Sequence, residues 1–215
     1  MIFAVVAALL TAYLIGSINF AVIFGNIFMK KDVRELGSGN AGATNVLRNG
    51  GFWPGMLTFL FDALKGFVAV SAGKMLFEYA YSVSGSEWLL PVYGAYACGT
   101  LCMLGHVYPV FFQFKGGKGV ATSVGIFAVC CPVAIISGLA VFALVLWLSR
   151  YVSLGSVLAT VVVVVLSIVF YDKSGLLWPQ LIFILIMGAI VILKHSTNIK
   201  RLLNGTENKI GKKAK

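Results

Sequence analysis

Charged residues are scarce in this chain of 215 residues, and their scarcity excludes an ordinary soluble domain. Asp, Glu, Lys and Arg make up 11% of the sequence, whereas a soluble domain carries about 25%. Hydrophobic residues make up 60%, and the mean hydropathy is +0.95. The composition therefore indicates a membrane protein. The net charge of +10 does not point to nucleic acid, because the charges lie in short breaks between apolar runs.

Cysteine is also rare, and the four cysteines lack the neighbours that a metal site needs. Two of them are one helical turn apart, a spacing that a metal or redox pair would use, but no His or carboxylate stands beside them. We expect them to be small buried hydrophobic side chains. They are Cys98, Cys102, Cys130 and Cys131.

The first apolar run lacks the basic leader of a signal peptide, since the first basic residue is Lys30. We therefore expect a retained transmembrane helix. A bilayer crossing takes about 20 apolar residues. Runs of suitable length cover roughly residues 3–28, 52–73, 89–111, 119–149, 152–171 and 176–194.

The run 119–149 is too long for one ordinary helix, and Pro132 interrupts it. If it crosses twice, fourteen of the 17 Lys and Arg residues lie on the cytoplasmic side. Only Lys74 and Lys173 then lie outside, and Lys65 lies within a span. Because cytoplasmic loops are enriched in Lys and Arg, we expect an all-α integral membrane protein with seven transmembrane helices. Its N-terminus is outside and its C-terminus cytoplasmic, and residues 1–215 form a single domain.

The first polar break contains GSGNAGATNVLR at 37–48, which matches the dinucleotide-binding spacing G-x-G-x-x-G. That motif needs a surrounding βαβ unit, and only about 22 residues separate the two membrane runs here. We therefore reject a dinucleotide site. Glycines still let a backbone approach a phosphate closely, and Arg48 offers a planar fork for it. The alternative is an ordinary Gly/Asn turn. The candidate phosphate-binding residues are Gly37, Ser38, Gly39, Asn40, Thr44, Asn45 and Arg48.

The second break, KGGKGVAT at 115–122, departs from a Walker A loop. Phe112 replaces its first Gly and Gly119 its Ser or Thr. A Gly-rich loop that opens a helix still suits an anion, so Gly116, Gly117, Lys118 and Gly119 become candidates. The alternative is a purely topological charge. We interpret His106 as a satisfied interfacial histidine.

The third break follows the last apolar run. His195 and Asn198 share one helix face if that span continues. An amphipathic tail on the membrane surface is an alternative that is compatible with this one. Within the second span, Asp62 and Lys65 are three residues apart, and we expect them to pair because an unpaired charge there is costly.

Together these segments resemble the bacterial acyl-phosphate:glycerol-3-phosphate acyltransferases. The resemblance rests on GSGNAGATNVLR, on GHVYPVFFQFKGGKGVAT and on H195-x-x-N198-I-x-R-L-L-x-G-x-E207. It extends over nearly the whole chain, including FDALKG at 61–66 and RYVSLGS at 150–156. Ser196 and Thr197 depart from the pattern, so they receive no role.

The resemblance implies an enzyme of phospholipid biosynthesis in the bacterial inner membrane, with its active site on the cytoplasmic face. It would transfer a fatty acyl chain from acyl phosphate to the 1-position of glycerol 3-phosphate. No cofactor, metal, nucleic acid or obligate protein partner is implied. The motif H-x-x-x-x-D of other acyltransferases is missing, which favours an activated acyl phosphate donor. The implied catalytic residues are Ser38, Arg48, Lys118, His195 and Asn198.

The resemblance leaves the proton acceptor open between His195 and the donor phosphate, and we rank His195 as a binder first. We expect Glu207 to tie the tail in place without taking part in the chemistry. An anion transporter or channel is the rival class, because it would also explain Asp62, Lys65 and the cationic loops. An inactive membrane scaffold would not explain the glycines.

The expected topology can be tested with introduced cysteines. In intact cells, Ser174→Cys should react with a membrane-impermeant maleimide, whereas Thr206→Cys should react only after the membrane is opened. The parent protein, with its native cysteines, supplies the background. The reverse labelling pattern would overturn the orientation.

Overall fold

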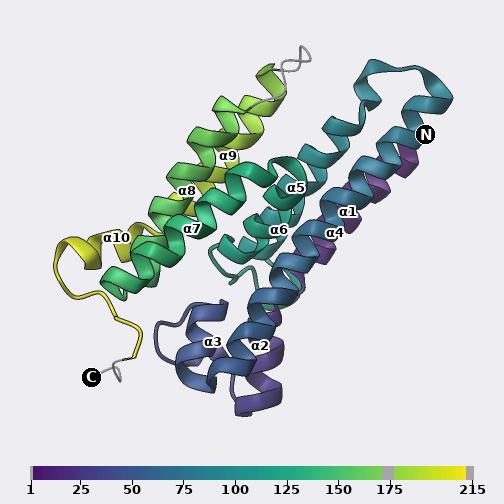
Figure 1. The fold of residues 1–215 in the computed structure, drawn as a ribbon. Coiled ribbons are helices and arrows are strands. Elements are labelled where there is room, and N and C mark those ends of the chain that lie inside the picture. Colours follow the sequence, from purple (N-terminus) through teal and green to yellow (C-terminus); the bar gives the residue numbers. More distant parts are fainter. Residues whose placement is uncertain (1, 171–176, 212–215) are drawn as a thin grey trace. The chain divides into compact units, whose positions relative to one another are not determined.

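The computed structural model describes residues 2–170 and 177–211, and every regular element in these ranges is a helix. The chain divides into two compact units, which meet in sequence between Cys130 and Cys131. Figure 1 labels their helices. Unit 1 contains α1 (Ile2–Ser17), α2 (Phe20–Phe24), α3 (Ala43–Gly50), α4 (Phe52–Ser84), α5 (Pro91–Val107) and α6 (Val120–Cys130). Unit 2 contains α7 (Pro132–Ser149), α8 (Val152–Val169), α9 (Leu177–Lys194) and α10 (Ser196–Leu203).

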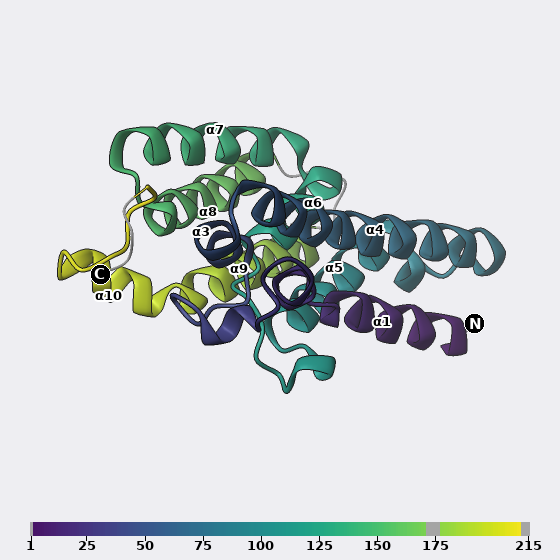
Figure 2. The same cartoon turned by 90° about the horizontal axis from the view of Figure 1, so that it is seen from below.

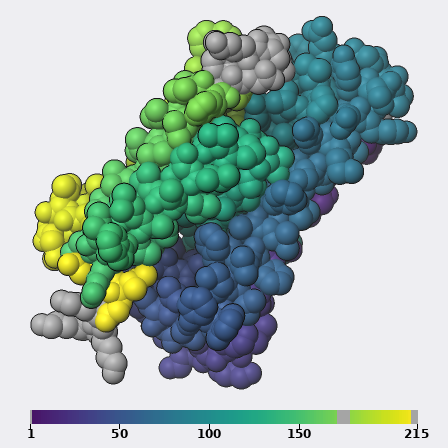
Figure 3. All heavy atoms as spheres, in the orientation of Figure 1, coloured from purple at the N-terminus to yellow at the C-terminus, as the bar shows by residue number. Residues whose placement is uncertain are grey.

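Unit 1 is arranged around the long helix α4, which packs against α1, α3, α5 and α6. Figures 1 and 2 both show α1 beside α4. In Figure 3 the side chains of α4, blue to teal, form a continuous strip along this unit. On α4, the apolar side chains Phe61, Leu64 and Phe67 are exposed. Apolar side chains on the outside of a helical unit are expected where lipid is the solvent.

The first apolar run is interrupted near its middle. Asn19 has an extended backbone, and its side-chain Oδ1 accepts a hydrogen bond from the N–H of Val22 at 3.2 Å, which caps α2. A short π-helix, Gly25–Met29, then ends the run at Lys30, whose φ is +56°. Together these pieces form one candidate membrane span, Ile2–Met29.

The second span is longer than expected. We expected a loop at 74–88, but α4 continues to Ser84, so Lys74 and Glu78 are helical residues. No Gly or Pro interrupts the sequence between Lys74 and Ser84. The helix ends at Gly85, whose φ of +66° suits glycine. Only a short 3₁₀ turn at Glu87–Leu89 separates it from α5.

Unit 2 begins where the long run 119–149 was expected to divide, and the break at Pro132 is confirmed. In this unit α8 packs against α7, α9 and α10. Helices α9 and α10 meet at an angle of 54°, at His195. The expected outer loop with Asp172, Lys173 and Ser174 lies outside the described residues.

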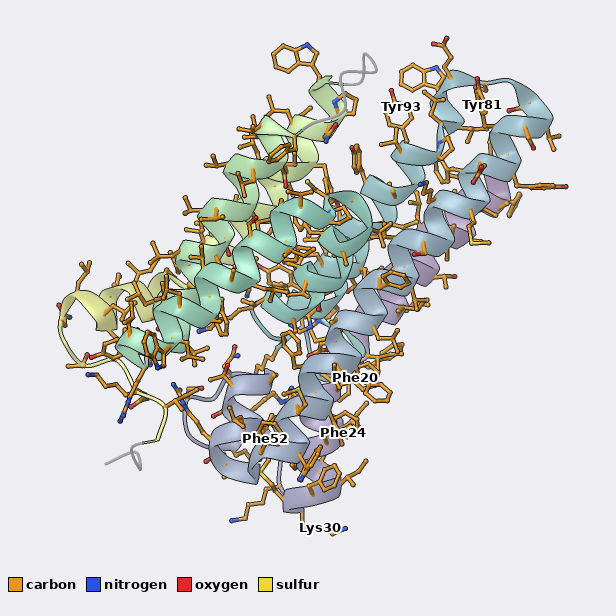
Figure 4. The ribbon with its side chains drawn as sticks, in the orientation of Figure 1. Phe20, Phe24, Lys30, Phe52, Tyr81 and Tyr93 are labelled. Atoms are coloured by element: carbon orange, nitrogen blue, oxygen red, sulfur yellow. The ribbon has the colours of Figure 1, made fainter. Side chains whose placement is uncertain are left out.

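Within the described residues, five helices are long and apolar enough to cross a membrane, or six if the bent pair α9 and α10 counts as one span. The remaining expected span is α6, whose 11 residues reach about 16 Å and cannot cross a hydrocarbon layer of about 30 Å alone. In Figure 4, Tyr81 and Tyr93 lie at the opposite end of unit 1 from Lys30. Aromatic and basic side chains at the two ends of a helical unit are typical of membrane–water interfaces.

Helices α4 and α6 approach so closely that glycine is required on both. A Cβ atom at Gly66 would overlap the carbonyl oxygen of Thr122, and one at Gly125 would overlap that of Ala63. Helices in lipid gain no hydrophobic driving force from packing together. Small residues let their backbones approach closely, and the van der Waals contacts that result hold the crossing together. The contact holds α6, and the loop before it, against α4.

This crossing yields a stability prediction. Gly66→Val should lower the melting temperature of the detergent-solubilised protein, because α6 must move away from α4 by more than a side-chain adjustment. Ala72→Val, at an exposed position of α4, is the control and should change the melting temperature little. Equal melting temperatures for the two variants would contradict the close crossing.

Candidate functional site

The segment 37–48 is built around the side chain of Asn45, which is buried. Its amide nitrogen lies 2.8 Å from the carbonyl oxygen of Val33, 2.9 Å from that of Leu36 and 3.1 Å from that of Asn40. Its Oδ1 accepts from the N–H of Ser38 at 3.2 Å. In the structure the Asn45 side chain holds the loop in shape. To bind phosphate, as we expected, it would have to give up these hydrogen bonds.

The glycines of this segment serve the turn. Gly37 and Gly39 have φ values of +53° and +70°, which only glycine adopts at little cost. The turn leaves Ser38 exposed and Asn40 half-buried. Helix α3 begins after Gly42, with Thr44 in its first turn and Arg48 in its last. Both side chains are half-buried, so the segment 37–48 presents the Ser38 hydroxyl on its turn and the Arg48 cation on α3.

The Gly-rich loop lies tightly against the end of α5. The N–H of Gly117 donates to the carbonyl oxygen of His106 at 3.2 Å. A Cβ at Gly116 would overlap that same oxygen, and one at Gly117 would overlap Nε2 of His106. Gly119, with φ of +83°, leads into α6. Gly116 and Gly117 are thus required by their close packing against His106. Lys118, between Gly117 and Gly119, is half-buried.

The structure brings the first two polar segments together. The carbonyl oxygen of Ala41 lies 2.6 Å from the position of a Cβ at Gly117. Nη1 of Arg34 donates to the carbonyl oxygen of Phe112 at 2.9 Å, which ties the first segment to the second. The same guanidinium binds both Asp32 oxygens through Nε, at 3.0 and 3.1 Å. Through these hydrogen bonds Arg34 holds the pKa of the Asp32 carboxyl below its usual value.

Sequence reasoning did not find Asp32 and Arg34. Their only signal is a carboxylate and a cation two residues apart just beyond a membrane run. The partner of Arg34 is a backbone carbonyl 78 residues away, which no spacing rule anticipates.

In unit 2, His195 stands at the bend between α9 and α10 and is only 3% exposed. The condition under which His195 and Asn198 would share one helix face, a continuous last span, is not met, because the chain bends by 54° between α9 and α10. Nδ1 of His195 lies 2.8 Å from the carbonyl oxygen of Val191. Since a carbonyl only accepts, Nδ1 carries a proton in this hydrogen bond.

Glu207 joins the tail to two helices of unit 2. Its Oε1 accepts from Ser153 on α8 at 3.0 Å and from Nδ2 of Asn198 on α10 at 2.9 Å. Its Oε2 accepts from Nε of Arg201 at 3.0 Å. A carboxylate engaged by three donors orients Asn198 and holds α10, as expected of a residue that ties the tail. Ser153 was not singled out from the sequence.

The expected pair of Asp62 and Lys65 is confirmed, with Oδ1 and Nζ 2.7 Å apart. Both side chains are almost fully buried in unit 1. His106, which we expected at the membrane interface, is buried in unit 1 at 3% exposure. Its Nδ1 lies 3.6 Å from the same Asp62 oxygen. The cysteines are free thiols, and all but the half-buried Cys130 are buried.

The chain matches the family model described as glycerol-3-phosphate acyltransferase over residues 6–205. It is 43% identical to glycerol-3-phosphate acyltransferase 2 of Bacillus anthracis, with 95% of this chain and 98% of the relative covered. It is 42% identical to the glycerol-3-phosphate acyltransferase of Thermoanaerobacter sp. (strain X514), with 98% of both chains covered.

Two crystal structures of PlsY (YgiH), an integral membrane glycerol 3-phosphate acyltransferase, are similar in fold. The glycerol 3-phosphate form has a TM-score of 0.80 at 36% identity, with 96% of each chain covered. The lysophosphatidic acid form has a TM-score of 0.77 at 36% identity, with 96% of this chain and 95% of that chain covered. Near-complete coverage and the apolar helices mark a multi-pass membrane protein, and the chain belongs to the glycerol-3-phosphate acyltransferase family.

Proposed function

We propose that this protein transfers a fatty acyl group from acyl phosphate to the 1-position of glycerol 3-phosphate, which gives lysophosphatidic acid and inorganic phosphate. The observation that carries the proposal is family membership over residues 6–205. Similar proteins solved in glycerol 3-phosphate and lysophosphatidic acid forms support the acceptor and the product. The missing H-x-x-x-x-D motif supports the donor, because acyl phosphate is already an activated mixed anhydride.

The reaction is an acyl transfer between two oxygens. The acceptor hydroxyl oxygen attacks the carbonyl carbon of the donor, an ester bond forms, and the bond from that carbon to the phosphate oxygen breaks. Phosphate is a good leaving group, so the protein mainly has to position two anionic reactants and neutralise their charge. This chemistry needs no metal or other cofactor.

In unit 1 we assign the phosphate contacts to Ser38, Arg48 and Lys118. The loops that carry them meet at Ala41 and Gly117, so their cations serve one region. Backbone N–H groups of Gly37, Gly39, Asn40, Gly116, Gly117 and Gly119, with the Thr44 hydroxyl, can supplement them. Asn45 contributes by holding the first loop in shape.

In unit 2 we assign contacts with glycerol 3-phosphate to His195 and Asn198. With Nδ1 donating to the carbonyl oxygen of Val191, a neutral His195 ring would offer Nε2 to the hydroxyl of glycerol 3-phosphate. The hydroxyl proton has two possible acceptors, Nε2 of His195 and the donor's own phosphate. Glu207 orients Asn198 and does not react.

We further propose seven crossings, with α6 as the short one, an outside N-terminus and a cytoplasmic C-terminus. The excess of Lys and Arg in the breaks assigned to the inside supports this orientation. The residues that hold phosphate then face the cytoplasm, from which glycerol 3-phosphate is drawn, and the acyl chain enters from the lipid. Residues 1–215 act as one acyltransferase in a bacterial inner membrane, without an obligate protein partner.

The site assignment predicts loss of transfer. Arg48→Ala and Lys118→Ala should each lower the incorporation of radioactive glycerol 3-phosphate into lipid-extractable product by about a hundredfold, since each removes a charge-assisted contact to a phosphate. Lys31→Ala removes an exposed cation outside the assigned site and is the control. Near-parental rates for both variants would refute the assignment, and a parental protein that makes no lipid product would favour the transporter.

A second prediction separates the two roles of His195. If this residue mainly binds, His195→Asn should raise KM for glycerol 3-phosphate more than it lowers kcat, because uniform binding is lost. Steady-state rates at a saturating donor concentration measure the two constants. A fall in kcat at unchanged KM would instead identify His195 as the general base.

A further inference from the structure

Charged and polar side chains form a buried cluster in unit 1 that the proposed chemistry does not use. Asp62 and Lys65 lie on α4, and His106 lies in the last turn of α5. Asp62 is 1% exposed, Lys65 4% and His106 3%. Ionisable groups within a membrane span are costly and need a reason to be there.

Lys65 connects the cluster to the break in the first span. Its Nζ lies 2.7 Å from Asp62 Oδ1 and donates to the carbonyl oxygen of Ile18 at 2.7 Å. It also lies 5.7 Å from the centre of the Phe20 ring, which is labelled in Figure 4. Ile18 lies in the interruption between α1 and α2, so Lys65 serves a backbone group that a continuous helix would have satisfied itself.

The interruption matters because it sets the course of the chain into the first polar segment. After it, α2 and the π-helix lead to Lys30, and from there to Arg34 and the loop 37–48. Ala21 and Val22 of α2 pack in one apolar cluster with Val33, Ala41 and Val46. A displacement of this interruption would therefore also displace the segment 37–48, which carries Ser38 and Arg48.

His106 connects the same carboxylate to the second loop. Its Nδ1 lies 3.6 Å from Asp62 Oδ1, an electrostatic contact longer than a hydrogen bond, and its backbone carbonyl accepts from the N–H of Gly117. Its ring fills the space that side chains at Gly117 would need. Because Gly117 directly precedes Lys118, a displacement of the His106 ring would also displace the backbone of Lys118.

We propose that Asp62 is a positioning residue for both phosphate-binding loops. Its ion pair with Lys65 stabilises the interruption after α1 that leads to the first loop. Its contact with His106 stabilises the end of α5, against which the second loop packs. The two loops touch at Ala41 and Gly117, so one carboxylate fixes both sides of this contact. The proposal rests on the assignment of Ser38, Arg48 and Lys118 to phosphate binding.

The test compares KM with kcat. Asp62→Asn and His106→Ala should each raise KM for glycerol 3-phosphate about tenfold, with kcat per folded molecule changed less than about threefold. A role in stability alone would lower the amount of folded protein, and hence the maximal rate, at an unchanged KM. The rates are therefore normalised to the monodisperse fraction of the purified protein.

Two controls separate positioning from general damage. Glu78→Gln makes the same carboxylate-to-amide change at an exposed position of α4. Cys102→Ala alters a buried α5 residue whose Sγ lies 3.6 Å from the carbonyl oxygen of Lys65 but which contributes nothing to the loop contacts described. Both should keep the parental KM, even if Cys102→Ala lowers the melting temperature.

The outcomes distinguish this proposal from the site assignment. An unchanged KM in Asp62→Asn and His106→Ala, while Arg48→Ala and Lys118→Ala lose transfer, would overturn the positioning role alone. Parental kinetics in all four variants would overturn the site assignment and the positioning role with it. If Asp62→Asn does not fold, His106→Ala decides, because it leaves the pair of Asp62 and Lys65 intact.

Discussion

The contact on which unit 1 depends most is the ion pair between Asp62 and Lys65 inside a membrane span. A lipid environment offers no water to satisfy a stray charge or a broken helix, so every polar group must find a partner within the protein. Lys65 meets two such needs at once, the carboxylate beside it and the carbonyl oxygen of Ile18 at the helix break. The break, in turn, allows the first span to turn into a folded polar segment.

The loops follow the same constraint. Asn45 uses its amide to satisfy three carbonyl groups of the first loop, and the second loop closes on His106 by a backbone hydrogen bond. In unit 2, Glu207 collects three donors and so holds α10 and Asn198. Each polar segment is thus internally held before any substrate arrives. Preorganisation of this kind is what electrostatic catalysis of an acyl transfer requires.

Much of the helical arrangement could be predicted from the sequence, because apolar run length and the proline at 132 are local signals. The pairing of Asp62 with Lys65 was also local, as the two are three residues apart. The role of the glycines was not: Gly116 and Gly117 resemble an anion loop, but their lack of side chains is required by His106. Likewise, the link from Arg34 to Phe112 and the bend at His195 depend on tertiary contacts that residue spacing does not encode.

The proposed activity requires that the protein moves an acyl group and does not merely bind or carry anions. The most direct measurement incubates purified protein with palmitoyl phosphate and glycerol 3-phosphate and quantifies both products over time. We expect equal amounts of inorganic phosphate and lysophosphatidic acid, with neither formed at an enzymatic rate when glycerol 3-phosphate is omitted. Phosphate release that does not depend on glycerol 3-phosphate, or no release at all, would contradict the proposed activity.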